Sequence, residues 1–317
     1  MSKLPITAIV MTFNEERNLP ACLDSVKDYI AEIVVVDSFS IDKTIEIAKC
    51  YTNRVYQHAF INQAKQFIWA TKTLDLSHEW ILRLDADERW TPEGFAELRE
   101  LIESGRYDGI YVKMKIFFMG RFIRHGAFYP NYFLRVYRKS KGEMEDRFMD
   151  EHIRVDGPTV RSNIDVLEMN HDRMYSLSDF TKKHNGYSSR EAAEYLVQKY
   201  ALLKLDSVGS VIGATTTEQK RWFKEHFYYR LPKFLRAILY WKYRYFLRLG
   251  FLDGMEGFIF HFLQGLWYRF LVDAKIYQTE RYAKEKGVGM KEAIREVLGI
   301  ELTPDPSLGK RGEAKQG

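Results

Sequence analysis

We predict an α/β fold, with a mostly parallel sheet and helices on both faces, followed by a helical, amphipathic C-terminal region. Three observations support this prediction. Runs of β-branched residues alternate with segments of helical periodicity through the first hundred residues, a pattern that forms βαβ units. Polar residues recur where those runs end. Basic and aromatic residues then crowd together between Lys220 and Arg281.

The composition limits the class of protein. The 317 residues, 46% hydrophobic and 29% charged, suffice for one large or two modest domains. Two cysteines provide no disulfide framework, which favours a reducing compartment. We expect neither a signal segment nor a transmembrane span, because no run of about 20 apolar residues exists. The small net charge of +5, and aromatic residues that follow core periodicity, argue against a nucleic-acid partner.

The first two strands are expected at residues 6–11 and 33–36. The second is almost entirely β-branched, as buried parallel strands are. An amphipathic helix follows each strand, beginning near Leu19 and near Ile41. A third strand at residues 80–84 leads into a helix. Thr91, Pro92 and Glu93 mark its start, as an N-cap, a proline at the first helical position and an acid in the first turn.

Polar residues follow each of these three strands. Because ligands of open α/β sheets bind at the carboxyl ends of the strands, we expect these residues to line one crevice. They are Thr12, Asn14 and Glu15, then Asp37, then Asp85 and Asp87. No glycine-rich loop is present, which excludes both a dinucleotide-binding fingerprint and a P-loop.

Asp85 and Asp87 are two residues apart, so in an extended chain their carboxylates project to one side. Like charges held this close raise each other's pKa unless a cation lies between them. A hard divalent cation that grips phosphate oxygens fits this position. The alternative is an acidic turn that caps the following helix, since helix N-termini attract acids.

The segments 10–16, 34–38 and 84–87 resemble the family 2 glycosyltransferases, which have the GT-A fold, in order and in spacing. The resemblance implies that Thr12, Asn14, Glu15 and Asp37 hold a nucleotide base, which we expect to be uracil. It implies that Asp85 and Asp87 hold ribose and a Mn²⁺ or Mg²⁺ ion on the diphosphate. Lys65 falls where relatives carry a basic residue, so we expect it near the diphosphate; otherwise it is a surface lysine.

A closer resemblance, to the lipopolysaccharide inner-core glucosyltransferases, extends to about Arg281. It rests on segments 117–121, 124–126, 145–152 and 251–254. It implies a sugar acceptor that is lipid-linked or a lipopolysaccharide core. The basic loop 121–126, between expected strands at 110–116 and 133–137, could meet an anionic acceptor or could be ordinary solvated loop.

An inverting transferase needs a carboxylate that deprotonates the acceptor hydroxyl. The resemblance places this base in the acidic cluster 145–151 without settling which residue it is. We favour Glu151, which precedes an expected strand at 152–155, over Asp150 and Asp146. In many GT-A enzymes a histidine after the last core strand completes the metal shell. His171, after the strand at 166–169, is placed for that role, although a lone histidine is more often structural.

The last third is expected to be helical from Ser178, with a flexible joint at 208–215. On a helical wheel of residues 233–249, Phe234, Leu235, Ile238, Tyr245 and Leu249 share an apolar face. Lys233, Arg236, Arg244 and Arg248 share the opposite, polar face, and Lys242 falls on the apolar side. Residues 258–271 are apolar nearly all round. This pattern suits a helix on an anionic membrane surface. The alternative is packing against the transferase domain or a second copy in a homo-oligomer.

We therefore expect a GT-A nucleotide-sugar-binding domain at 1–175, a helical region at 176–300 and a disordered tail at 301–317. The expected function is inverting, metal-dependent transfer of a sugar, from a donor such as a UDP-hexose, to a lipid-linked or lipopolysaccharide-core glycan. The enzyme would be peripheral on the cytoplasmic face of the inner membrane. The alternatives are a sugar-nucleotide nucleotidylyltransferase and a catalytically silent membrane-associated scaffold.

Overall fold

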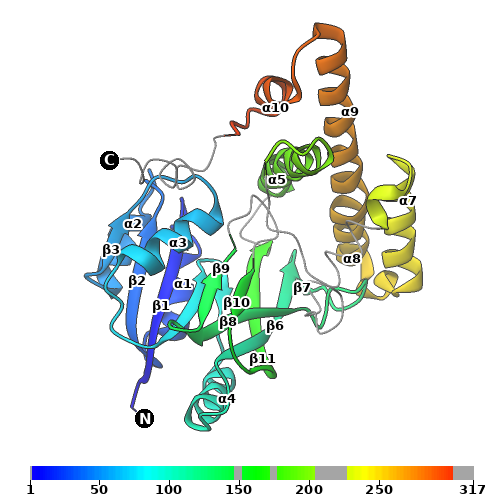
Figure 1. Ribbon diagram of the computed structural model, residues 1–317. Coiled ribbons are helices and arrows are strands. Elements are labelled where there is room, and N and C mark those ends of the chain that lie inside the picture. The colour runs from blue at the N-terminus through cyan, green and yellow to red at the C-terminus, as the bar shows by residue number, and fades with distance from the viewer. Residues whose placement is uncertain (1, 146–151, 172–176, 204–226, 303–317) are drawn as a thin grey trace, which may run out of the picture.

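The computed structural model describes residues 2–145, 152–171, 177–203 and 227–302. It consists of a twisted sheet with helices on both faces and a helical C-terminal region beside one edge of the sheet (Figure 1). The predicted α/β fold with a helical C-terminal region is thus confirmed. The expected joint at 208–215 and residues 303–317 of the expected tail lie outside the described residues.

The chain order of the elements follows the alternation expected from the sequence. The strands are β1 (Leu4–Thr12), β2 (Ile30–Asp37), β3 (Val55–Gln57), β4 (Trp80–Asp85), β5 (Glu88–Arg89), β6 (Gly109–Phe118), β7 (Arg121–Phe122), β8 (Tyr132–Arg138), β9 (Gly142–Met144), β10 (Ile153–Val155) and β11 (Thr159–His171). The α-helices are α1 (Leu19–Val26), α2 (Thr44–Tyr51), α3 (Gln63–Thr73), α4 (Pro92–Glu103), α5 (Leu177–Lys199), α7 (Leu235–Lys242), α8 (Gly254–Phe260), α9 (Tyr268–Lys286) and α10 (Met290–Leu298).

The main sheet has the strand order β3-β2-β1-β4-β8-β6-β11-β5, with β7 beside β6. β3, β2, β1 and β4 are parallel, as expected. β8 is antiparallel to both of its neighbours, so the sheet as a whole is mixed. This direction follows from a short connection, because β8 returns beside β6 through a loop of residues 119–131 and not through a crossover helix.

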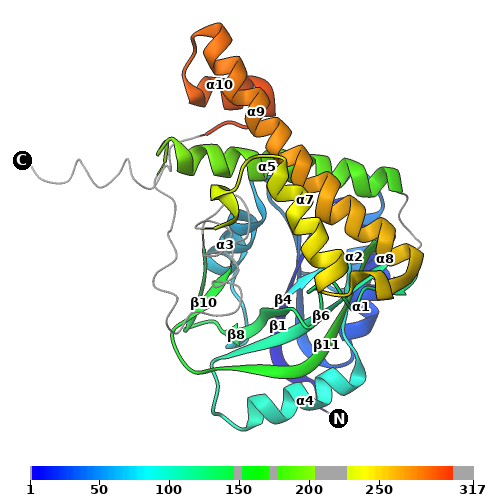
Figure 2. The ribbon, with the colours of Figure 1, turned by 90° about the vertical axis from the view of Figure 1, so that its right-hand side faces the viewer.

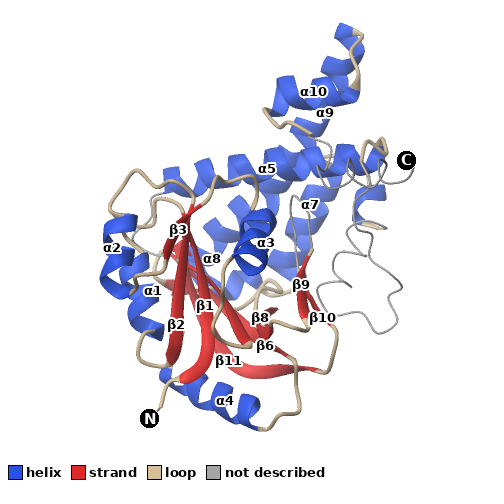
Figure 3. Ribbon diagram, turned by 60° about the vertical axis from the view of Figure 1, so that its left-hand side comes forward, coloured by secondary structure: helices blue, strands red, loops and turns tan. Residues whose placement is uncertain are grey.

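Two apolar layers cover the two faces of the sheet. Buried residues of α1, α2 and α4 pack on one face with alternate residues of β1, β2 and β4. α3 and the hairpin β9–β10 pack on the other face, around Phe67 and Ile81. Figure 3 shows these helices on either side of the strands. The carboxyl ends of the parallel strands remain uncovered by either layer, which leaves that edge free for a site.

The start of α4 forms as the sequence predicts. Thr91 has extended backbone angles, and its hydroxyl oxygen accepts a hydrogen bond of 3.1 Å from the backbone N–H of Gly94. Pro92 occupies the first turn, where its missing N–H leaves no donor unpaired. The cap therefore fixes where the turn after β5 ends and α4 begins.

A β-bulge interrupts the pairing of β6 with β8. Ile110 pairs with Val136, but the next residue of β6, Tyr111, pairs with Leu134. Arg135 is therefore an extra residue on β8. Bulges re-aim a side chain that regular alternation would direct elsewhere, and this one directs Arg135 toward the carboxyl end of β4.

The C-terminal helices pack on one another and on the edge of the sheet. α5, α9 and α10 share an apolar core that includes Leu196, Val272, Ile276 and Ile294. In Figures 1 and 2, α5 crosses above the carboxyl ends of the central strands. A smaller core joins these helices to the sheet through rings from β6, α5 and α8. Within the described residues, none of the helices combines the length and apolar character needed to traverse a bilayer.

The predicted polar face of residues 233–249 is wrong for two of its four members. Arg236 and Arg244 are each only 1% exposed, whereas Leu235, Ile238 and Leu249 of the predicted apolar face are exposed. One reason is that α7 ends at Lys242 and a π-helical segment, Tyr243–Leu247, follows, so a single helical wheel does not apply. Another is that both arginines have partners that are distant in sequence.

The two buried arginines bind polar groups from other elements. Arg236 Nε donates to Asp273 Oδ1 of α9 at 2.9 Å. Arg244 Nε donates to the carbonyl of Gly126 at 3.1 Å, and its guanidinium lies 3.7 Å from the ring centroid of Phe128. Because buried charges need such partners, these contacts hold Arg236 and Arg244 inward and leave Leu235, Ile238 and Leu249 exposed.

We expect Arg236→Met to lower the free energy of unfolding by about 3 kcal/mol, because it leaves the Asp273 carboxylate buried without its ion pair. Arg248→Met, on the same segment but exposed, should change it by less than about 0.5 kcal/mol. Urea unfolding followed by tryptophan fluorescence measures both. Equal effects of the two substitutions would contradict the inward placement of Arg236.

Candidate active site

The ends of β1 and β2 bring three predicted residues together. Thr12 and Asp37 are paired across the two strands, both are buried, and the Thr12 hydroxyl donates to Asp37 Oδ1 at 3.0 Å. Asn14 has a positive φ of 55°, and its side-chain oxygen accepts from the backbone N–H of Ile41 at 2.9 Å. Ser40 links the two sides: its backbone N–H donates to Asp37, and its hydroxyl accepts from the N–H of Asn14.

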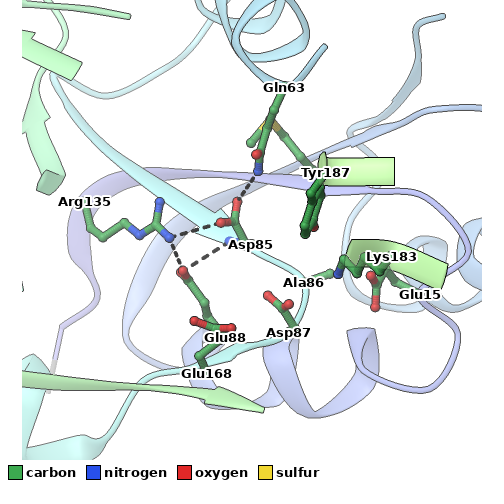
Figure 4. Close-up of a pocket in the computed structure, with 11 residues that line it drawn as sticks. Glu15, Gln63, Asp85, Ala86, Asp87, Glu88, Arg135, Glu168, Lys183 and Tyr187 are labelled. Carbon is green, nitrogen blue, oxygen red and sulfur yellow. Dashed lines mark hydrogen bonds and ion pairs between the residues drawn. The ribbon is translucent and has the colours of Figure 1, made fainter. Parts of the chain in front are cut away.

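A polar pocket lies beside these strand ends, under α5 (Figure 4). Asp85 and Asp87 both line it, as predicted, and so does Glu15. The remaining lining residues come from α3, β5, β8, β11 and α5, and from the end of β1 and the turn after β4. They are Met11, Gln63, Ala86, Glu88, Arg135, Glu168, Lys183 and Tyr187. The lining therefore has five carboxylates and two cations, an excess of negative charge.

Arg135 joins two of the carboxylates. Its Nη2 lies 3.0 Å from Asp85 Oδ2 and also donates to Glu88 Oε1. Burial alone would raise the pKa of Asp85, but Arg135 and Arg83 outweigh it, so that the pKa is lowered and Asp85 is ionised. Glu88 is more deeply buried and lies near both aspartates, and its pKa rises to about 8 in spite of Arg135. The bulge on β8 thus provides the cation that positions Asp85.

Asp87 and Glu168 carry the uncompensated charge of the pocket. Burial raises the pKa of both carboxyl groups, and each is raised further by a neighbouring acid. The pKa of Glu168 rises to about 7, with Asp87 as the main charged cause. Asp87 and Glu168 are half-buried and repel one another, and an added cation stabilises such a pair of carboxylates. The residues present therefore fit a divalent ion.

The described residues contain no group of three or more His, Cys, Asp or Glu side chains arranged to hold a metal ion. This agrees with the usual binding of Mg²⁺ through one or two carboxylates together with substrate phosphates, and not by a cage made only of protein side chains. Gln63 also helps to position Asp85, since its Nε2 donates to Asp85 Oδ1 at 3.3 Å.

Lys183 and Tyr187 close the pocket from α5, on its right-hand side in Figure 4 and one helical turn apart. Burial lowers the pKa of Lys183, but Tyr187, Asp87 and Glu15 together raise it well above its ordinary value. Lys183 is therefore a firmly protonated ammonium group that faces the acidic turn. The C-terminal region supplies this charge to a site otherwise built from the sheet.

The structure places the other predicted residues less decisively. Lys65 lies in the first turn of α3, and its backbone N–H donates to the side chain of Asn62, but it does not line the pocket. His171 ends β11, where its backbone pairs with Phe118 of β6, and its side chain is outside the description. Asp146, Asp150 and Glu151 also lie outside the described residues. The roles of all five remain predictions.

Sequence reasoning missed Arg135, Glu168 and Lys183. Glu168 could have been selected from the sequence, because an acid inside an apolar strand is unusual and indicates a functional or structural role. The sequence contains only a weak signal for Arg135, since the direction of this side chain depends on the bulge in β8. Lys183 is one of several lysines on α5 and could be selected only once α5 had been placed over the sheet.

Part of the chain matches a known protein family. Residues 7–161 match the model of glycosyl transferase family 2. The chain carries a family 2 glycosyltransferase domain. The matched region runs from within β1 to the start of β11 and includes Thr12, Asp37, Asp85 and Asp87. The predicted membership, and glycosyl transfer as the enzyme class, are thus confirmed.

Relatives of this glycosyltransferase extend over most of its length. It is 28% identical over 302 residues to the lipopolysaccharide core biosynthesis glycosyltransferase LpsC of Rhizobium meliloti, which covers 92% of this chain and 98% of the relative. It is 26% identical over 275 residues to an uncharacterized glycosyltransferase of Rickettsia typhi, covering 82% and 84%. Among solved structures, glucosyl-3-phosphoglycerate synthase from Mycobacterium tuberculosis, with Mg²⁺ and UDP, is 18% identical. That match covers 35% of this chain and 43% of the synthase, with a TM-score of 0.29.

We expect Asp87→Ala to leave the fold intact and to abolish metal-assisted binding of UDP. The melting temperature without ligand should not fall, because the substitution removes a half-buried carboxylate that is repelled by Asp85. Calorimetric titration with UDP, with and without Mn²⁺, should show at least a tenfold loss that is confined to the titration with metal. Glu100→Ala on the exposed side of α4 is the matched control. Unchanged Mn²⁺ dependence in Asp87→Ala would rule out this metal assignment.

Proposed function

We propose that this glycosyltransferase is an inverting, metal-dependent enzyme that moves a hexose from a UDP-linked donor to a lipid-linked or lipopolysaccharide-core glycan. The observation that carries the proposal is the meeting of two predicted groups at one edge of the sheet. Thr12 and Asp37 pair directly, and Met11, which precedes Thr12, pairs with Asp85. The base-binding and diphosphate-binding residues are therefore on adjacent strands, about 5 Å apart.

The donor would lie across this edge. Its uracil would lie near Thr12, Asn14 and Asp37, and its diphosphate in the polar pocket. Asp85 and Asp87, with His171, would hold Mn²⁺ or Mg²⁺, which when bound would neutralise the charge that develops on the leaving diphosphate. Arg135 holds the Asp85 carboxylate in place. Lys183 would donate to diphosphate oxygens from the side of α5.

The acceptor hydroxyl needs a base, and the candidates lie in the acidic cluster that follows β9 in the sequence. Glu145 is buried, and its carboxylate lies 2.6 Å from Arg154 Nη2, so this acid is engaged in an ion pair. Its backbone N–H donates to the carbonyl of His152 at 2.9 Å, next to the pairing of β9 with β10. We propose Glu151 as the base, as the sequence favours, with Asp150 and Asp146 as alternatives.

The nature of the acceptor is supported by the relative that is named for lipopolysaccharide core biosynthesis, whose match covers nearly the whole of both chains. A lipid-linked acceptor places the reaction at a membrane surface, and we propose the cytoplasmic face of the inner membrane. The test is a screen of nucleotide sugars by UDP release, with lipid extracts as acceptors and Mn²⁺ or Mg²⁺ present. Absence of UDP binding in a companion titration would refute the proposal.

We expect Lys183→Met to weaken the binding of UDP by roughly tenfold, about 1.4 kcal/mol, and to leave the affinity for uridine unchanged. The reason is that uridine lacks the diphosphate that the ammonium group would contact. Lys182→Met changes the neighbouring, exposed lysine of the same helix and serves as the control. A parallel loss of uridine affinity would assign Lys183 to the structure of the pocket instead.

We expect Glu151→Gln to retain donor affinity and to lose at least about a hundredfold in kcat, the size of a general-base contribution. Asp150→Asn and Asp146→Asn are made in parallel, so that the three rates are compared under one assay. If Glu151→Gln turns over like the unsubstituted enzyme and one of the others does not, the base is that other residue.

A further inference from the structure

The surface around the turn between α7 and α8 has an unusual distribution of polarity. Six large apolar side chains are exposed within ten residues, and two of them, Leu247 and Met255, are 75% and 67% exposed. We call this set the apolar corner. Its members are Phe246, Leu247, Leu249, Phe251, Leu252 and Met255. In Figure 1, α7 and α8 lie at the right-hand side of the molecule, on the opposite side from β2 and β3.

Polar groups occupy the inner side of the same turn. Arg244, Asp253 and His261 are each no more than 2% exposed. Asp253 accepts from the backbone N–H of His125 at 2.8 Å and lies 2.6 Å from His125 Nδ1. Specific polar contacts occupy this interior, so the apolar side chains cannot turn inward without breaking them. Leu249 is even held at a positive φ of 58° with its side chain exposed.

The charges around the apolar corner favour an anionic surface as its partner. Arg124, Lys242 and Arg248 are exposed beside it. The segment from Leu231 to Leu271 has only two acids: Asp253 is buried, and Glu256 lies 3.8 Å from Arg121. Exposed apolar groups bordered by cations, in a described segment whose only two acids are buried or near an arginine, match the boundary between anionic headgroups and acyl chains.

The apolar corner is also tied to the basic loop 121–126 and to the pocket. Besides His125, the backbone N–H of Gly126 donates to the carbonyl of Arg248 at 2.8 Å. On the inner side, Phe260 of α8 packs on Phe118 at the end of β6, with ring centroids 5.3 Å apart, and Phe118 packs on Phe180 of α5. Lys183 follows Phe180 by one helical turn. A surface that held the apolar corner would thereby fix the orientation of the pocket.

We propose that the apolar corner is the membrane-docking surface of this enzyme, inserted at the headgroup boundary of an anionic leaflet. Loop 121–126 then lies at the lipid surface, where Arg121 and Arg124 meet the anionic part of a lipid-linked acceptor. This second statement rests on the proposed function, whereas docking to the leaflet does not. The sequence predicted that residues 233–249 contact a membrane as a helix lying on its surface. The structure favours a different geometry, in which the turn after α7 inserts into the headgroup boundary.

The test is flotation of the full chain with vesicles that contain phosphatidylglycerol, compared with vesicles of phosphatidylcholine alone. We expect the unsubstituted protein to float with the anionic vesicles. The double variant Leu247→Glu and Met255→Glu should lose at least tenfold in vesicle binding while its UDP affinity stays the same. Ile61→Glu, an equally exposed apolar position before α3, is the control and should float normally.

The outcomes separate this proposal from the proposed function. Undiminished flotation of the double variant overturns the docking surface, whatever the enzyme transfers. If the unsubstituted protein does not float but forms dimers in light scattering that the double variant abolishes, the corner binds a second copy and the membrane proposal is overturned. Flotation that depends on the corner, together with absent UDP binding, retains the docking surface and removes the proposed function alone.

Discussion

The surplus of negative charge at the carboxyl edge of the sheet is the constraint on which the site depends. Five carboxylates and two cations line one pocket, and the burial that makes it a binding site also raises the free energy of keeping those acids ionised. Arg135 relieves part of this cost at Asp85 and Glu88, whereas at Asp87 and Glu168 the strongest compensating cation among the described residues is Lys183. A cation placed between these acids would lower the free energy of keeping them ionised. This charge distribution is the physical basis of the proposal that the site binds a metal with a diphosphate.

The same principle, that buried charge must find a partner, shapes the C-terminal region. Arg236 with Asp273, and Arg244 with the Gly126 carbonyl, bind elements that are distant in sequence. These pairs are strong local constraints because losing either partner leaves a charge in an apolar interior. Once these arginine contacts form, polar groups occupy the inner side of the turn, and its apolar side chains stay exposed. Exposure of the apolar corner is in this sense a consequence of satisfying the arginines.

Much of the fold and part of the site follow from the sequence. Apolar runs located β1, β2 and β4, and the cap at Thr91 located the start of α4, because these signals are local. The carboxylates after β4 could be assigned to one edge because parallel strands share it. Arg135 escaped because a bulge, which depends on the pairing of β6 with β8, sets its direction. Lys183 and the inward arginines escaped because tertiary partners decided their placement, and no periodicity within the segment records those partners.

The pocket draws its walls from residues as far apart as Met11 and Tyr187. During synthesis all strands of the sheet have been made once the chain reaches His171. The pocket still lacks Lys183 and Tyr187 until α5 has been made and has packed over the edge of the sheet. A nascent or truncated chain that stops after β11 would therefore contain all five acids of the pocket but would lack Lys183 and Tyr187 of α5. The capacity to hold a donor would then appear late, and only in a molecule whose C-terminal helices, and with them the apolar corner, had already assembled.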